Sequence, residues 1–338
     1  MLLVATDTHF EDHDAGRGHP ERPARLRAVL DGLDAGAPPD ARRRLEPRRA
    51  KRAELERVHT AVYLDHLERF CAAGGGHLDA DTGASAASWD AALLAAGSGL
   101  EAADALERGD GDWAFCAVRP PGHHAVAERA MGFCLLNNVA VTAAALRDRG
   151  ERVLVVDWDA HHGNGTQDIF YADGSVMYVS MHEWPLYPGT GRLDDAGTGA
   201  GAGATVNFPL PAGATGDVYL DAIDSVVEPL VERFAPTWVL VSAGYDAHRA
   251  DPLTGLGLSA GDYVDLTARV MALAPARRMV VFLEGGYDLD ALRDSTAATV
   301  STLLGRPERV EPATAGGPGR TVVHAARDLH ASGPRSSG

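Results

Sequence analysis

The chain has 338 residues, with 31 Lys and Arg against 47 Asp and Glu, and its formal net charge is −16. This length fits one large domain or two modest ones, and 45% hydrophobic residues can build a sizeable core. The acidic balance excludes a direct nucleic-acid partner, because binding phosphates requires a basic surface.

The cysteines and the N-terminus also narrow the class of protein. Cys71, Cys116 and Cys134 form an odd set without C-x-x-C spacing, which predicts neither a disulfide framework nor a thiolate zinc site. The chain starts without basic residues, and its first apolar run ends after five residues. This is typical neither of a signal peptide nor of a membrane span, so we expect a cytoplasmic protein without a membrane partner.

Strand-like and helix-like segments alternate along the chain. Short apolar runs predict strands at Leu2–Ala5, Trp113–Val118, Arg152–Asp157, Ser175–Ser180, Thr205–Leu210, Trp238–Val241 and Met279–Leu283. Apolar residues at helical spacing predict helices at about Pro23–Leu33, Ala53–Ala72, Ser88–Leu106, Leu136–Arg149, Gly216–Phe234, Ala260–Ala274 and Leu289–Leu304. Several strands are apolar on both faces, which is typical of a parallel sheet covered by helices.

These elements predict an α/β fold with a single, mostly parallel β-sheet flanked by helices on both faces. We expect one domain over residues 1–310. From Glu311 onward Gly, Pro, Ala and Ser dominate, which predicts a loosely ordered tail over residues 311–338 with a short helix near Val322–His330.

Polar side chains follow four of the predicted strands. In chain order they are His123 and His124, then Asp157, Asp159, His161 and Asn164, then Asp246, and finally Tyr287. Ligands bind outside the carboxyl ends of the strands in an open parallel sheet. We therefore expect all of these side chains at one edge of the sheet.

A metal site is predicted at the second of these segments. Asp159 and His161 are two residues apart and share a face of an extended chain, so both can reach one ion. Asp246 is the natural third ligand. Two carboxylates and an imidazole with one open position suit a catalytic zinc ion, and iron or cobalt would also fit. The alternative is that the aspartates only cap a strand end.

Acid–base groups are predicted beside this site. His123 and His124 follow a stiff Pro-Pro-Gly segment and could act on a metal-activated water, with Asp157 and Asn164 as candidate acceptors for their rings. Tyr287 could donate its hydroxyl to a developing oxyanion, or be a tyrosine at the edge of the core.

Six segments in this order resemble the histone deacetylase family, and most closely its class II branch with bacterial deacetylases and acetylpolyamine amidohydrolases. They are RPPGHHA (Arg119–Ala125), GFCLLNN (Gly132–Asn138), VDWDAHHGNGTQ (Val156–Gln167), YVSMHEWPLYPGTG (Tyr178–Gly191), SAGYDAHRADPL (Ser242–Leu253) and LEGGYDL (Leu283–Leu289). The opening GHPERPARL (Gly18–Leu26) fits as well. The resemblance implies the arginase/deacetylase fold and zinc-dependent hydrolysis of an N-acetyl amide to acetate and free amine.

The resemblance also implies a role for each matched position. One zinc ion per chain would be bound by Asp159, His161 and Asp246. The catalytic set would be His123, His124, Asp157, Asn164 and Tyr287. In this set His124 is the general base and acid, while Asp157 orients His123 and Asn164 orients His124.

Further positions match the surroundings of the family's reaction centre. The substrate tunnel would be formed by Gly132, Phe133, Tyr187, Leu253, Gly285 and Gly286, and Arg25 would lie near an acetate-release pocket. Structural potassium is implied at an inner site formed by Asp157, Asp159, His161, Ser180 and Met181. An outer potassium site would be formed by Phe170, Asp173, Val176 and Tyr219.

The substrate class is open at this point. Polyamine-selective members resemble one another in a glutamate after the D-P dipeptide beyond the third zinc ligand, and this chain has Leu253 there, as in members that accept acetyl-lysine. This favours an acyl-lysine substrate, although the acidic charge would also attract a cationic polyamine. A small acylated metabolite is a third alternative. The sequence allows either a monomer or a homo-oligomer.

Two other classes of function stay open. An arginase-like ureohydrolase with two manganese ions would need an additional aspartate where this chain has Asn164. A catalytically inactive module that binds acyl groups would be marked by the loss of Tyr287 or of a metal ligand, and neither is lost.

Overall fold

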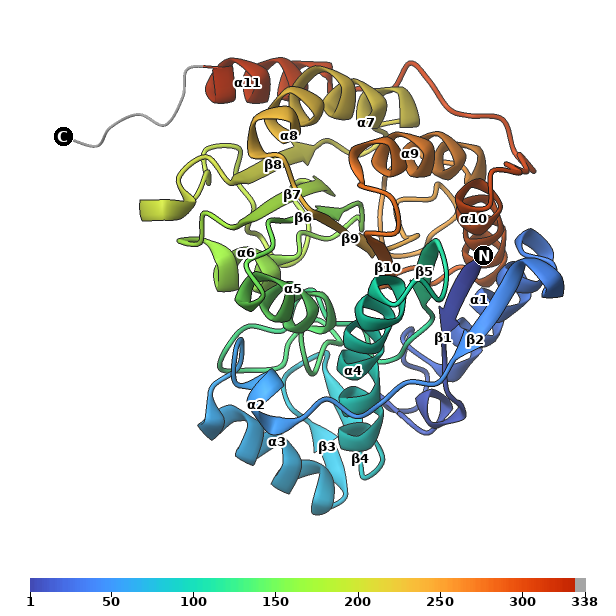
Figure 1. Ribbon diagram of the computed structural model, residues 1–338, viewed down its shortest axis with the longest axis vertical. Coiled ribbons are helices and arrows are strands. Elements are labelled where there is room, and N and C mark those ends of the chain that lie inside the picture. Colours follow the sequence, from blue (N-terminus) through green and yellow to red (C-terminus); the bar gives the residue numbers. More distant parts are fainter. Residues whose placement is uncertain (332–338) are drawn as a thin grey trace.

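The structure is a computed structural model and describes residues 1–331. Its centre is an eight-stranded sheet in the order β2-β1-β5-β10-β9-β6-β7-β8, in which every neighbouring pair is parallel (Figure 1). The strands are β1 (Leu2–Ala5), β2 (Arg42–Leu45), β5 (Trp113–Cys116), β6 (Val153–Asp157), β7 (Val176–Glu183), β8 (Thr205–Leu210), β9 (Trp238–Ala243) and β10 (Met279–Leu283). A separate antiparallel pair is formed by β3 (Gly75–His77) and β4 (Gly83–Ser85). The predicted α/β class is confirmed.

The central strands are buried along their whole length because helices cover both faces of the sheet. Every residue of β6, β9 and β10 is buried, as the uniformly apolar runs predict. On one face α4 and α5 pack against each other and against these strands, and α9 and α10 lie on the other side (Figure 1).

The helices agree with the predicted segments in most places. They are α1 (Pro23–Gly36), α2 (Arg52–Leu55), α3 (Ala61–Ala72), α4 (Ser88–Glu107), α5 (Asn138–Asp148), α6 (Asn164–Phe170), α7 (Gly216–Ala222), α8 (Glu228–Phe234), α9 (Ala260–Leu273), α10 (Leu289–Leu303) and α11 (Arg320–Ala331). Short 3-10 turns lie at Thr8–Glu11, Pro39–Ala41 and Gly199–Gly201. None of the helices in residues 1–331 combines the length and apolar character needed to cross a bilayer.

Two predicted helices are interrupted. The segment Ala53–Ala72 divides into α2 and α3, because Thr60 accepts a hydrogen bond from the Tyr63 N–H and starts a new helix. The segment Gly216–Phe234 contains a π-helical turn at Ile223–Val227 between α7 and α8. Pro229 follows this turn and has no N–H to donate to a helical hydrogen bond.

Four elements, β2, β3, β4 and α6, have no counterpart in the predicted set. The strand β2 carries three consecutive arginines and forms the edge of the sheet beside β1, where charged side chains protect an open edge. The β3–β4 pair is too short to show a period. The helix α6 begins at Asn164, shortly after the D-x-D-x-H segment in sequence. Its first residues resemble a glycine-rich loop, so the sequence predicts no helix there.

The chain beyond Glu311 is packed against the domain as far as Ala331. The Glu311 carboxylate accepts a hydrogen bond from the Ala260 N–H at 2.8 Å, at the start of α9. On α11, Val323 and Ala326 are fully buried, and the helix packs against β8 and the π turn. A loose tail was expected here, and the domain boundary at residue 310 stays a prediction. For residues 332–338 the expectation falls outside the described residues.

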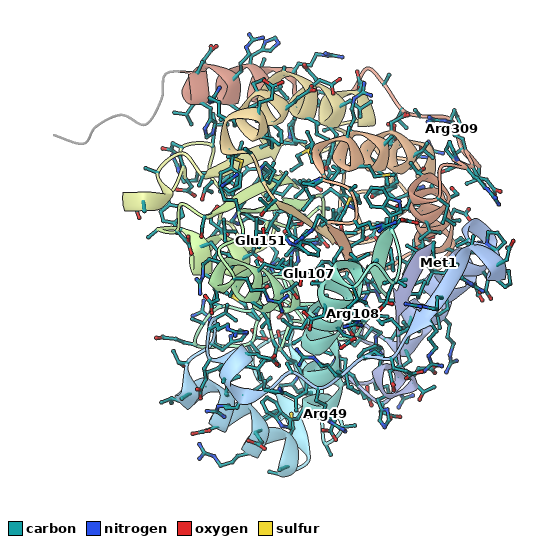
Figure 2. The ribbon with its side chains drawn as sticks, in the orientation of Figure 1. Met1, Arg49, Glu107, Arg108, Glu151 and Arg309 are labelled. Carbon is teal, nitrogen blue, oxygen red and sulfur yellow. The ribbon has the colours of Figure 1, made fainter. Side chains whose placement is uncertain are left out.

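Ion pairs on the surface connect elements that are distant in sequence (Figure 2). Arg309 binds Asp265 of α9 at 2.7 Å, and Glu107 at the end of α4 contacts both Arg149 and Arg278. These pairs are exposed to solvent, so each contributes little to stability.

Candidate active site

Four neighbouring strands deliver the polar residues that the sequence singles out. The strands β5, β10, β9 and β6 are adjacent in the sheet, and the segments that follow their carboxyl ends carry the two tandem histidines, Tyr287, Asp246 and the D-x-D-x-H run. Side chains from distant parts of the sequence therefore meet at one edge. The predicted convergence is confirmed.

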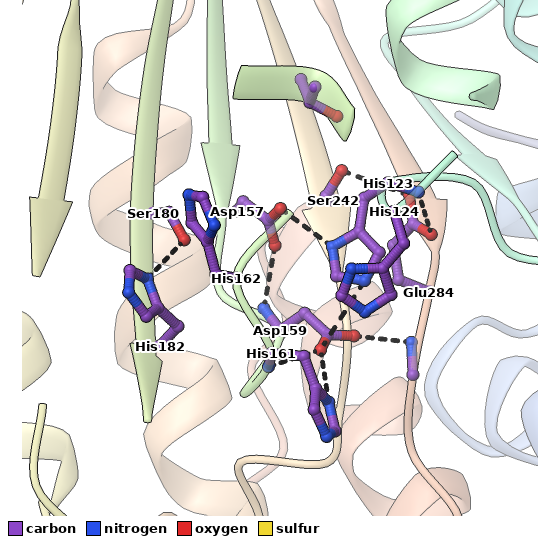
Figure 3. Close-up of polar contacts among 12 residues, drawn as sticks. His123, His124, Asp157, Asp159, His161, His162, Ser180, His182, Ser242 and Glu284 are labelled. Atoms are coloured by element: carbon purple, nitrogen blue, oxygen red, sulfur yellow. Dashed lines mark hydrogen bonds and ion pairs between the residues drawn. The ribbon is translucent and has the colours of Figure 1, made fainter. Parts of the chain in front are cut away.

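The three predicted metal ligands form one cluster. Asp159, His161 and Asp246 are all buried, and one potential ligand atom from each lies within 4.8 Å of the others. His161 Nδ1 is 3.0 Å from Asp246 Oδ2. It is 3.2 Å from Asp159 Oδ1 (Figure 3). Two carboxylate oxygens and one imidazole nitrogen fit a zinc ion with an open position for water.

Main-chain groups hold these carboxylates in place. Asp159 Oδ2 accepts the Gly285 N–H at 2.7 Å, and Asp246 Oδ1 accepts the Ala160 N–H at 2.7 Å. A Cβ at Gly285 would overlap Asp246 Oδ2 and lie 2.6 Å from Asp159 Oδ2. Glycine at this position is therefore required by the close approach of the backbone to both carboxylates.

The electrostatics of the cluster favour a cation. Burial and the neighbouring charge of Asp159 raise the pKa of Asp246 to about 7. Burial would also raise the pKa of Asp159, but the positive charge of His123 and the bonds to His161 hold that pKa well below its usual range. Two carboxylates buried this closely repel each other, and a divalent ion between them would remove the repulsion.

The tandem histidines each bind the predicted partner. His123 Nδ1 lies 3.0 Å from Asp157 Oδ2, and His124 Nδ1 lies 2.9 Å from Asn164 Oδ1. The two rings are adjacent, with centroids 4.0 Å apart (Figure 3). Asp157 also accepts a hydrogen bond from the Tyr178 hydroxyl at 3.0 Å, a contact that no sequence motif indicates.

The two histidines differ in protonation. Burial would lower the pKa of His123, but the charges of Asp157, Asp159 and Glu284 outweigh it and raise the pKa to about 10. Burial lowers the pKa of His124 well below its usual value, and the charge of His123 lowers it further. His124 is therefore neutral near pH 7 and can accept a proton.

Aromatic rings of the predicted tunnel residues contact other residues of the site. The rings of Phe133 and Tyr287 are 5.8 Å apart, and those of His124 and Tyr187 are 5.2 Å apart. Gly132 has φ +55°, and a Cβ there would lie 2.8 Å from His124 Cγ and 2.9 Å from Tyr187 Cε1. Their assignment to a substrate tunnel stays a prediction.

Two of the predicted tunnel residues are exposed. Tyr187 and Leu253 each expose 37% of their surface. Leu253 is held by its N–H, which donates to Asp251 Oδ1 at 3.0 Å, and Asp251 Oδ2 accepts the N–H of Tyr287 at 2.7 Å. Asp251 thus connects Leu253 to Tyr287, a role for which the sequence gives no signal.

Arg25 lies beneath Tyr287, with its guanidinium 4.9 Å from the ring centroid. Its Nε donates to the Gly286 carbonyl at 2.6 Å and its Nη2 to the Glu284 carbonyl at 2.5 Å. Its Nη1 donates to the buried Glu21 carboxylate at 3.2 Å. Arg25 therefore supports the glycine turn that carries Tyr287, and the acetate-release role stays a prediction.

Some residues of the two predicted potassium sites pair with or hydrogen-bond to other residues of the same sites. Ser180 lies opposite Asp157 in the β6–β7 pair, and the Tyr219 hydroxyl donates to the Met181 carbonyl at 3.4 Å. The Asp173 N–H donates to the Phe170 carbonyl at 2.9 Å. Val176 begins β7, and the Asp173 carboxylate binds Ser175 and Arg147. The potassium assignment stays a prediction.

Buried charged residues around the site were not identified from sequence. Arg119 donates to Glu21 at 2.5 Å and 2.6 Å, and both side chains are fully buried. Glu284 is also fully buried, next to the tandem histidines. Glu21, Arg119 and Glu284 stand inside the quoted motifs, but composition and spacing cannot tell a buried charge from an exposed one.

Comparison with known proteins agrees with this geometry. Residues 19–303 match the histone deacetylase domain. The chain belongs to the histone deacetylase domain family. It is 41% identical over 300 residues to a probable deacetylase of Archaeoglobus fulgidus, covering 87% of this chain and 83% of that protein. It is 40% identical over 287 residues to a histone deacetylase-like amidohydrolase of Pseudomonas aeruginosa, covering 81% and 73%.

A solved structure extends the similarity to the whole fold. The HDA15 HD domain superposes with a TM-score of 0.90 at 37% identity, covering 99% of this chain and 95% of that one. The recognition of the histone deacetylase family from sequence is confirmed, and so is the α/β fold. Membership identifies the chain as a deacetylase or amidohydrolase of this family with a metal-binding site.

Proposed function

We propose that the chain is a zinc-dependent amidohydrolase that cleaves N-acyl amides of acyl-lysine type to a free amine and a carboxylate. The observation that carries the proposal is the buried Asp159, His161 and Asp246 cluster beside two histidines whose Nδ1 atoms are both occupied. Each histidine thereby keeps its Nε2 for chemistry.

The roles of the residues follow from their protonation and position. Zinc held by the cluster would polarise the amide carbonyl and lower the pKa of a bound water. His124 accepts the proton of the attacking water, since its lowered pKa keeps the ring neutral. The Tyr287 hydroxyl donates to the oxygen that gains negative charge, and His124 then protonates the leaving amine.

Other chain residues prepare this step. Asp157 holds His123, and Asn164 fixes the ring of His124 through Nδ1. The walls formed by Phe133 and Tyr187 suit the apolar stem of an acylated lysine, because aromatic rings exclude water from it. Arg25 is assigned to the acetate-release pocket, next to the turn that carries Tyr287.

We assign bound potassium a structural role at the two sets named above. The proposal rests on oxygen atoms, since hard monovalent and divalent cations prefer carboxylate, hydroxyl and carbonyl ligands. A potassium ion at the inner set, which includes Asp159 and His161, would help to hold these two metal ligands in place.

An acetylated polyamine is a second candidate substrate, and one observation favours it. Burial raises the pKa of the Tyr187 hydroxyl, and the negative charges of Asp81 and Asp79 raise it further. Two carboxylates therefore act on Tyr187, which is assigned to the tunnel in this proposal, and there they would attract a cationic chain.

The test compares turnover of an acetyl-lysine peptide, a trifluoroacetyl-lysine peptide and N-acetylputrescine by the zinc-loaded protein. Wild-type protein should hydrolyse the lysine peptides faster, while Tyr287→Phe and His124→Ala lower kcat by about 100-fold or more. Faster hydrolysis of N-acetylputrescine would replace the substrate class but keep the mechanism. Near wild-type turnover in both variants would contradict the proposed site.

A further inference from the structure

Glu284 occupies the junction of three segments of the active site. It follows directly after β10, the strand between β5 and β9 in the sheet. Its side chain is fully buried. Glu284 Oε2 accepts the Gly122 N–H at 2.7 Å. Oε2 also accepts the His123 N–H at 3.2 Å, and Oε1 accepts the Ser242 hydroxyl at 3.2 Å (Figure 3).

These contacts fix one side of the segment that carries the tandem histidines. On the other side, the His123 carbonyl accepts the Thr166 N–H at 3.2 Å and a bond from Asn137 Nδ2 at 3.4 Å. The main chain of His123 is therefore held at its N–H by Glu284 and at its carbonyl by two other elements. The direction of both imidazole rings depends on this segment.

The main chain of Glu284 is itself immobilised. Its N–H donates to the Ala243 carbonyl at 3.1 Å, and its carbonyl accepts Arg25 Nη2 at 2.5 Å. Both bonds oppose a movement of the Cα atom toward the histidine segment if the side chain is shortened. The length of the glutamate therefore decides whether an oxygen reaches the two N–H groups.

We propose that Glu284 is a positioning residue whose reach, and not its charge, holds Gly122 and His123 so that both histidines face the metal cluster. The inference rests on the proposed function only where activity is measured. The hydrogen bonds of Glu284 are part of the fold and do not depend on that function. Neither the metal ligands nor the acyl substrate need to touch Glu284 for this role.

The surroundings of Glu284 indicate that its contacts do not require a charge. Burial raises the pKa of Glu284 to about 7, although the charge of His123 and the two N–H donors act against this. A neutral amide of the same length has an oxygen for Gly122 and His123, and its NH2 group can donate to the Ser242 hydroxyl oxygen.

The experiment separates reach from charge with two conservative variants. Glu284→Gln keeps the reach and loses the charge, whereas Glu284→Asp keeps the charge and is shorter by one methylene. We expect kcat of Glu284→Gln to stay within about threefold of wild type and kcat of Glu284→Asp to fall about 10- to 100-fold, because small misplacements of acid–base groups are costly. KM should change by less than about threefold in both.

Ser242→Ala is the matched control, since it removes the Oε1 contact and leaves both N–H contacts. It should stay within about twofold of wild-type kcat. The opposite order, with Glu284→Asp active and Glu284→Gln inactive, would overturn the proposal, and so would equal activity in all three variants. If Glu284→Asp does not fold, loss of kcat in folded Glu284→Gln still contradicts it.

A second readout is independent of turnover. In histidine side-chain 15N spectra of the zinc-loaded proteins, the His124 signals should superpose for wild type and Glu284→Gln and should move in Glu284→Asp. The His123 signals are left out of this comparison, because the charge of Glu284 helps to raise the pKa of His123. If wild-type protein hydrolyses no acyl amide, the proposed function fails while these spectra still decide the inference. Unchanged His124 signals in Glu284→Asp would overturn it.

Discussion

Replacing Gly285 by alanine should damage the metal site before it damages the fold. The new Cβ would overlap Asp246 Oδ2 and lie 2.6 Å from Asp159 Oδ2, about 0.8 Å inside an ordinary contact of 3.4 Å. Ligand distances in a metal site tolerate only about 0.2 Å. Both carboxylates would have to move by several times that tolerance, and the N–H bond from Gly285 to Asp159 would be distorted with them.

We expect the zinc affinity of Gly285→Ala to fall by at least about 100-fold, which corresponds to about 2.7 kcal/mol. The assay is competition for zinc with a chromophoric chelator, together with urea unfolding of the metal-free protein. Gly257→Ala is the control, because its Cβ would meet its nearest atom, the Ala214 carbonyl oxygen, at 3.2 Å. That variant should bind zinc as tightly as wild type.

The reasoning is refuted if Gly285→Ala binds zinc with wild-type affinity. The methyl group forces the Oδ2 atoms of Asp159 and Asp246 to move. If zinc affinity were unchanged after this movement, the two carboxylates would not bind one ion together. If the metal-free variant loses as much free energy of unfolding as it loses free energy of zinc binding, the substitution damages the fold and not specifically the metal site.

Three further predictions concern the surroundings of the site. Burial lowers the pKa of His59 to about 4. Because the unfolded chain binds this proton near pH 6.5, the free energy of unfolding should fall by up to about 3 kcal/mol as pH drops from 6.5 to 4. Urea unfolding of His59→Gln should show a smaller fall over the same pH range. Gly132→Ala should lower kcat by at least about tenfold at unchanged zinc content, because the Cβ would lie 2.8 Å from His124 Cγ; a wild-type kcat would contradict this. Val323→Ala should lower the free energy of unfolding by about 2 kcal/mol, since the side chain is fully buried, and no change in urea unfolding would mean that α11 is not docked in solution.

Much of the fold was predictable because it depends on local pattern. The strands β6, β9 and β10 are apolar on both faces, and only a sheet covered on both sides buries such runs. The spacing of Asp159 and His161 placed both on one face of an extended segment, and the parallel sheet then brought Asp246 to them. Each of these inferences needs only the sequence and the geometry of a strand.

The remaining features depend on tertiary partners and left no local signal. The strand β2 is made of arginines because it lies at an edge, and its position beside β1 cannot be read from its own residues. Arg119 and Glu21 appear as ordinary charged residues, although the fold buries both completely and pairs them. The same holds for Glu284, whose role follows only from the positions of β5 and β9.

Metal titration of stripped protein tests the central claim most directly. Turnover of an acetyl-lysine peptide should be absent without metal, rise linearly with added zinc and level off at one ion per chain. Asp246→Ala should not recover activity at any zinc concentration within this range. A break at two ions per chain with activity on a guanidino substrate would favour a ureohydrolase, and full turnover in the presence of excess chelator would contradict the metal site altogether.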